Sequence, residues 1–137
     1  LQAFLLIYFR LLPKTKNLFM RGRFGNKARL THILEAIGEI ENYLQDVDFA
    51  TFERNSMMKF ACIKQLEIID EATHLITSLL KEKYHNIQWL QIVGLRNFLI
   101  HEYFGVDLKV VWDILNNDIL IYKVQIQEIV AENIDLQ

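Results

Sequence analysis

Leu30-Thr-His-Ile-Leu-Glu-Ala-Ile-Gly-Glu-Ile-Glu-Asn-Tyr-Leu44 is the stretch that decides the fold of this chain. Its apolar residues at positions 30, 33, 34, 37, 40 and 44 recur at intervals of three and four, the spacing of an amphipathic helix. Glu35, Glu39 and Glu41 fall between them and take the solvent side. The stretch therefore predicts a helix with one buried face, which further helices must cover.

Helical spacing continues toward the C-terminus. Residues 46–51 predict a break, and a second helix is expected over residues 55–83. Asn86 is a candidate cap for a third helix that carries Trp89 and the apolar residues up to Ile100 and stops at Gly105. Asp107 is expected to cap a short helix over residues 107–115. Residues 116–118 should interrupt it before a last helix over residues 119–130.

The composition supports a single helical domain. One proline and five glycines among 137 residues are too few for a many-stranded sheet and suit long helices joined by short turns. We therefore predict an all-α, antiparallel bundle of four to five main helices over residues 27–137, preceded by an extension over residues 1–26. Residues 87–100 and 119–130 are apolar on most helix faces, which predicts a homodimer that buries the second face.

Charge is divided unevenly along the chain. Residues 1–34 carry seven basic side chains and no acid, whereas residues 35–137 carry a net charge of −9. The basic arm could bind nucleic acid or an anionic surface by charge alone. The alternative is an extension outside the core domain, because the first residue is Leu and Met20 precedes the helical pattern.

The compartment is predicted from the apolar N-terminus and the cysteine content. Residues 1–9 are too short to span a bilayer and follow no charged region, which argues against a membrane anchor or an ordinary signal peptide. Cys62 is the single cysteine and stands in an apolar run, which predicts a buried, inert thiol. No metal-ligand spacing is present, and neither a metal nor a cofactor is expected. A cytoplasmic location follows as the expectation.

Arg96-Asn97-Phe98-Leu99-Ile100-His101-Glu102-Tyr103 concentrates the chemically versatile residues. Arginine matches phosphate oxygens, histidine titrates near neutral pH, and asparagine offers neutral donors and an acceptor. On a straight helix Arg96 and His101 lie about 140° apart, and Asn97 lies within about 40° of His101. For Arg96 and His101 to converge, the helix must break, the arginine must reach around it, or a second subunit must complete the site. An isolated Arg and His would more often have purely structural roles.

This Arg-polar-x3-His-x-Tyr pattern resembles the signature of the HEPN superfamily, and specifically of its HepT-like toxins. The resemblance extends over residues 27–132. It includes residues 31–37, the Glu71-Ala72 step, Trp89, Gly94 and the Val111-Trp112 pair. One position departs from the family, because Asp70 stands where HepT-like chains usually carry a glycine.

The resemblance implies a metal-independent endoribonuclease that is the toxin of a toxin-antitoxin pair. It assigns catalytic roles to Arg96, Asn97 and His101 and a 2′,3′-cyclic phosphate to the product. It also implies a partner, a small nucleotidyltransferase antitoxin that silences the toxin by attaching AMP to Tyr103. The alternative is a non-catalytic helical module that binds nucleotide or substrate for a separately encoded nucleotidyltransferase. His32, His74 and His85 receive no catalytic role, and Tyr43, Tyr84 and Tyr122 are interpreted as packing residues.

Overall fold

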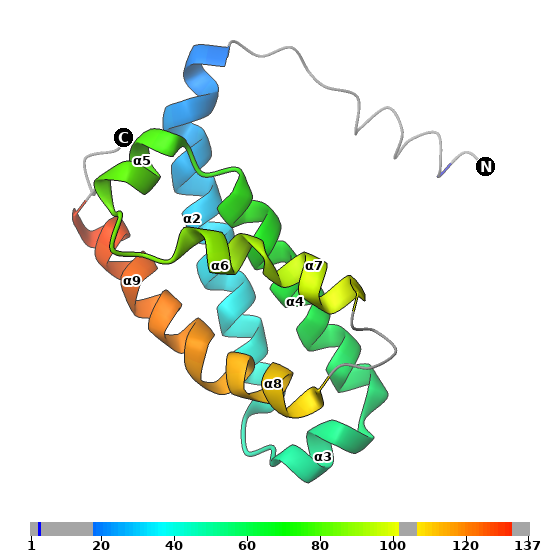
Figure 1. Cartoon of the computed structure of the whole chain (residues 1–137). Helices are drawn as coiled ribbons and strands as arrows, with labels where there is room; N and C mark the ends of the chain where they lie inside the picture. Colours follow the sequence, from blue (N-terminus) through cyan, green and yellow to red (C-terminus); the bar gives the residue numbers. More distant parts are fainter. Residues whose placement is uncertain (1–2, 4–17, 102–106, 133–137) are drawn as a thin grey trace.

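The computed structural model describes residue 3 and residues 18–101 and 107–132, and within these ranges every regular element is a helix (Figure 1). The predicted all-α fold is confirmed. The elements are α2 (Leu18–Leu44), α3 (Phe49–Arg54), α4 (Ser56–His74), α5 (Ser78–Lys83), α6 (Trp89–Val93), α7 (Leu95–His101), α8 (Leu108–Asp113), the π-helix η1 (Ile114–Asp118) and α9 (Ile119–Glu132).

Helices α2, α4 and α9 form the main body of the bundle. Helix α2 packs against both α4 and α9, and Figure 1 shows it running in the opposite direction to each of them. Their facing surfaces are fully buried and include Ile33, Ile37, Leu66, Ile69, Ile126 and Ile129. Each such side chain contributes roughly 1.5–3 kcal/mol when it leaves water, so this apolar seam is the main source of stability. None of the described helices is both long and apolar enough to cross a membrane.

A buried polar contact connects α4 to α9 inside this seam. The hydroxyl oxygens of Thr73 and Tyr122 lie 2.9 Å apart, and the two side chains are 0% and 3% exposed. Burial raises the pKa of Tyr122 far above its ordinary value, so the phenol stays protonated. The Trp89 ring meets the Tyr122 ring edge to face, with centroids 6.2 Å apart, and its Nε1 donates to the Tyr84 carbonyl oxygen at 3.0 Å. These contacts seat α6 over the seam.

The first helix begins earlier than its apolar pattern indicates. Helix α2 starts at Leu18 and runs without interruption through residue 26, where the predicted extension ends. Asn26 is only 9% exposed because its amide binds the turn before α5. Its Nδ2 donates to Thr77 Oγ1 at 2.9 Å, and its Oδ1 accepts from the Thr77 N–H at 3.1 Å. The boundary between an extension and the helical domain at residue 26 stays a prediction.

The same amide explains why the predicted helix over residues 55–83 is wrong between 75 and 77. Helix α4 ends at His74, and α5 begins at Ser78 after a turn in which Ile76 is buried. Thr77 has extended backbone angles and accepts from the Leu80 N–H at 3.5 Å, so it caps α5. Asn26 binds the Thr77 N–H and hydroxyl and thereby stabilises this turn from across the bundle.

The expected break at residues 46–51 is shorter than predicted. Asp46 adopts a positive φ of 56°, and Asp48 then caps α3 by accepting from the Thr51 N–H at 2.8 Å. The hydrogen bonds from Thr51 lower the pKa of the Asp48 carboxyl. Helix α3 consequently begins at Phe49, inside the predicted break.

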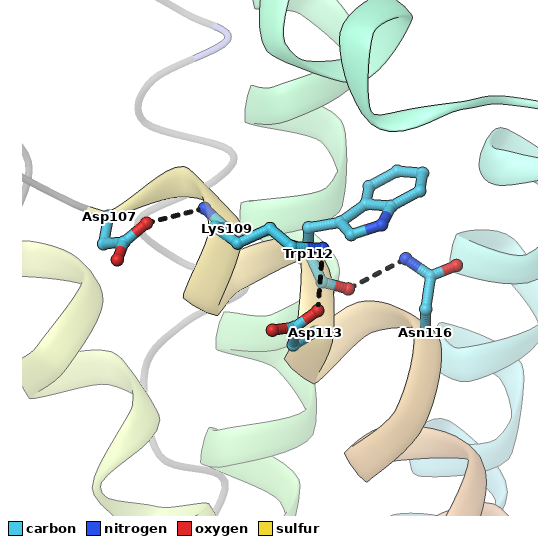
Figure 2. Close-up of polar contacts among 5 residues, drawn as sticks. All are labelled: Asp107, Lys109, Trp112, Asp113 and Asn116. Carbon is cyan, nitrogen blue, oxygen red and sulfur yellow. Dashed lines mark hydrogen bonds and ion pairs between the residues drawn. The ribbon is translucent and has the colours of Figure 1, made fainter.

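The C-terminal helices form one continuous run. Asp107 caps α8, as predicted, by accepting from the Lys109 N–H at 3.0 Å, and the Lys109 ammonium pairs with Asp113 at 3.2 Å (Figure 2). The predicted interruption at residues 116–118 lies within a π-helix over residues 114–118 and is not a break in the chain, and α9 begins at Ile119, where the last helix was predicted to start. Asn116 Nδ2 donates to the Trp112 carbonyl oxygen at 2.8 Å within this wider turn.

Replacing Asn26 with Ala should lower the free energy of unfolding by about 1–3 kcal/mol, because Thr77 loses both hydrogen bonds in a part-buried position. Urea denaturation followed by circular dichroism measures this loss. Asn42→Ala is the matched control, since Asn42 is exposed on the same helix and gains the same helix propensity. Equal stability of the two variants would show that the Asn26 contacts contribute nothing.

Candidate active site

The candidate site is centred on α7, which follows α6 across Gly94. The third helix was expected to start near Asn86, but Asn86 is exposed in a turn and α6 begins at Trp89 without a side-chain cap. Gly94 keeps helical backbone angles, its N–H donates to the Leu90 carbonyl oxygen at 3.1 Å, and its carbonyl oxygen accepts from the Phe98 N–H at 3.1 Å. The hydrogen-bond ladder therefore runs almost unbroken from α6 into α7.

The described side chains of α7 differ in burial along the helix. Leu99 is 3% exposed, and Leu95 and Phe98 pack half-buried against the core. Asn97 is exposed. Because Leu95 and Leu99 both pack against the core and lie one helical turn apart, they fix the rotation of α7 about its axis and direct Asn97 outward.

The backbone of α7 carries three of the four predicted site residues. Arg96 lies in the first turn and His101 is the last residue, and the side chains of both lie outside the described part of the chain. Tyr103 lies outside the described residues altogether. The helix is continuous from 96 to 101, so the backbone positions of Arg96 and His101 remain about 140° apart and about 7.5 Å along the axis. The interruption at Gly94 precedes both residues and does not bring them together.

A cavity of about 430 Å³ adjoins the start of α7. Ile69 of α4, Leu95 of α7 and Tyr122 of α9 contribute apolar wall. Its polar edge consists of amides and one carboxylate, from Asn86, Gln88, Gln91, Gln125 and Asp118. Such an edge suits a neutral hydrogen-bonding group better than a phosphate. Ile69 and Leu95 both line the cavity, so α4 and the beginning of α7 lie close to each other there.

The three other histidines, and the three tyrosines that were interpreted as packing residues, lie within the described part of the chain. His32, His74 and His85 are exposed, and Tyr122 is buried. Tyr43 and Tyr84 are half-buried against the core. Within residues 18–101 and 107–132, no three His, Cys, Asp or Glu side chains gather as a set that could hold a metal ion.

Sequence reasoning missed one buried charged residue beside this site. Asp70 of α4 is 5% exposed, and it follows Ile69, which lines the cavity. The sequence contains no local signal that this acid is buried, because α4 is half-buried on several faces.

Comparison with known proteins identifies the family. The model of the family described as "Ribonuclease HepT-like" matches residues 33–129. The chain belongs to the HepT-like family. A relative from Methanocaldococcus jannaschii, named "Putative RNase MJ1380", is 42% identical over 93 residues, which are 68% of this chain and 85% of that protein.

Two further relatives carry similar names. "Putative RNase MJ0125" of the same organism is 37% identical over 106 residues, 77% of this chain and 91% of that protein. "Probable ribonuclease HepT" of Thermococcus cleftensis is 38% identical over 95 residues, 69% of this chain and 86% of that protein. No solved structure matches the chain significantly. The chain thus belongs to a family in which these relatives carry the names of ribonucleases.

The thiol of Cys62 should be unreactive in the folded protein. The residue is 0% exposed, and burial raises its pKa to about 11 from 9.0. At pH 8 this shift lowers the thiolate fraction about 100-fold, so labelling by a disulfide reagent should slow by at least that factor relative to urea-unfolded protein. Equal labelling rates in the folded and unfolded protein would contradict the burial.

Proposed function

We propose that this HepT-like chain is a metal-independent endoribonuclease and the toxin of a toxin-antitoxin pair. The observation that carries the proposal is the complete Arg96-Asn97-x3-His101-x-Tyr103 set in a chain whose relatives are named as ribonucleases. Its first three members stand on one short helix that the core holds through Leu95 and Leu99.

The proposed reaction uses the nucleophile that RNA already contains. His101 acts as general base and takes the proton of a ribose 2′-hydroxyl. The 2′-oxygen attacks the adjacent phosphorus, and the bond from phosphorus to the 5′-oxygen breaks. The leaving 5′-oxygen takes up a proton from solvent. The products are a 2′,3′-cyclic phosphate and a free 5′-hydroxyl.

Arg96 and Asn97 would serve the phosphate. The guanidinium of Arg96 stabilises the additional negative charge on the phosphate oxygens as the pentacoordinate phosphorus develops. Asn97 holds a phosphate oxygen or orients His101, to which it is close in helical register. The exposure of Asn97 in the folded chain supports this role, because a substrate can reach its amide.

Regulation is proposed to act through Tyr103. A nucleotidyltransferase antitoxin would attach AMP to the phenol oxygen, transferring it from a nucleoside triphosphate with release of diphosphate. Negatively charged phosphate beside Arg96 would then occupy the position of the substrate phosphate and neutralise the guanidinium. The nearness of the two residues in sequence supports this arrangement.

A homodimer is part of the proposal. Three large apolar side chains of α6 and α9 are exposed: Leu90 is 86%, Ile121 62% and Val124 53% exposed, and Ile121 also lines the cavity. They lie within residues 87–100 and 119–130, the two stretches that are apolar on most helix faces and therefore predict a partner surface. A second copy that covers them would remove this apolar surface from water and could place a second α7 near the first.

Cleavage of RNA in EDTA tests the catalytic assignment. Purified protein without AMP on Tyr103, as judged by intact mass, should cut RNA and leave cyclic-phosphate ends. His101→Ala and Arg96→Ala should each lower the rate by at least about 100-fold, because one removes the base and the other the charge stabilisation.

The matched controls are His85→Ala and Arg54→Ala, which remove the same side chains from exposed positions outside α7. Cleavage that persists in His101→Ala would contradict the role of the histidine. If unmodified, folded wild-type protein cuts no RNA, the ribonuclease proposal fails and the non-catalytic partner module becomes the better account.

Leu90→Lys combined with Ile121→Lys should convert a dimer to a monomer, because two charges on the apolar surface would have to be desolvated at an interface. Analytical ultracentrifugation measures the change. Leu79→Lys is the control. Leu79 is 79% exposed on α5, and no residue of α5 lines the cavity. A dimer that survives both Lys substitutions would place the interface elsewhere.

A further inference from the structure

Asp70 of α4 is a buried acid. It is 5% exposed, and the other buried polar side chains of the described part, Asn26 and Thr73, are uncharged. Burying a carboxylate costs several kcal/mol unless a cation and hydrogen bonds compensate it. The helices that cover this side of α4 must therefore contribute to its environment.

The flank of α4 that carries Asp70 faces away from α2. Gln65 Nε2 donates to the Tyr43 hydroxyl of α2 at 3.2 Å, and Ala72 lines a groove together with Arg29 of α2. Gln65 and Ala72 therefore mark the α2 side of the helix. At 100° per residue, Asp70 lies about 140° from Gln65 and about 160° from Ala72. Its burial consequently comes from other neighbours.

Those neighbours are α6 and α7, which both pack on α4. The contact lies at the level of Asp70, because the preceding residue, Ile69, lines the cavity together with Ile92 of α6 and Leu95 of α7. Arg96 directly follows Leu95 in the first turn of α7. Figure 1 shows the same arrangement, with α6 and α7 lying across the C-terminal half of α4.

Arg96 is the one permanent cation that these two helices contain. Residues 89–101 include no lysine and no second arginine. On α4 itself, Glu67 pairs with Lys64 at 3.5 Å one turn before Asp70, and His74 is exposed one turn after it. Arg29 of α2 lies on the opposite flank, where it borders the groove with Ala72.

We propose that Asp70 is a positioning residue for Arg96: its carboxylate accepts hydrogen bonds from one edge of the guanidinium and leaves the other edge for the substrate phosphate. This inference rests on the proposed ribonuclease function for its catalytic consequence, but the ion pair itself does not. Arginine presents its donors as a rigid planar fork, so a carboxylate on one edge fixes the direction of the other. Asp70 would thereby hold the Arg96 side chain in one orientation before RNA binds.

A double-substitution cycle tests the pair without reference to activity. Asp70→Asn and Arg96→Gln each remove one charge and keep the side-chain shape approximately. Each should lower the melting temperature by more than about 5 °C, because each removes the proposed ion pair of the buried Asp70 carboxylate. The double variant should lose less than the sum of the two. If a single variant fails to fold, recovery of folding in the double variant would show the same coupling between the two residues.

The kinetic readout separates positioning from mere stability. In folded Asp70→Asn protein, kcat for RNA cleavage should fall about 10- to 100-fold while KM changes much less, because Arg96 keeps its charge but loses its orientation. Glu71→Gln is the matched control, since Glu71 is the adjacent acid and is exposed. It should leave both constants unchanged.

The outcomes distinguish the two proposals. Additive losses of melting temperature would overturn the Asp70–Arg96 pair, whether or not the protein cuts RNA. Equal kcat in wild type and Asp70→Asn would overturn the positioning role even if the charges are coupled. Coupled charges in a protein that cuts no RNA would leave the pair standing and reject the ribonuclease function.

Discussion

Burial of the inner face of α4 is the constraint on which the rest of the structure depends. Helix α4 contacts α2 on one flank and α6 and α7 elsewhere on its surface, and Leu66, Ile69 and Thr73 along it are fully buried. Apolar burial has no direction of its own, so it could not alone fix how α9 lies in the bundle. The hydroxyl pair of Thr73 and Tyr122 supplies that direction, because an unmade hydrogen bond in this dry seam would be costly.

The site inherits its position from the same seam. Helix α7 has only seven residues, which is too short to be stable in isolation. Its place depends on Leu95 and Leu99, which pack on the core. The chemistry proposed for Arg96, Asn97 and His101 thus depends on a helix that the core holds in place. Substitutions in the seam would therefore alter the site by rotating or tilting α7.

Local sequence pattern predicted the helical elements well and the interruptions poorly. The bodies of α2, α4 and α9 follow the apolar spacing, and Asp107 was recognised as a cap from its own neighbourhood. The break before Thr77 depends on Asn26, which is 51 residues away, and no local pattern contains that contact. For the site, the motif identified residues and family. The burial of Asp70 arises from packing between helices, which a spacing rule does not describe.

The π-helix at residues 114–118 sets the phase between the two ends of the C-terminal run. Trp112 on α8 packs against Phe49 and Phe52 of α3, with ring centroids 5.9 and 5.2 Å apart, while Tyr122 on α9 faces the seam. A π-turn holds one residue more than an α-turn. A chain one residue shorter here would rotate α8 by about 100° relative to α9 and turn Trp112 away from α3. The length of this segment is therefore as constrained as its composition. An insertion or deletion within it would change the direction in which the chain enters α8 at Asp107.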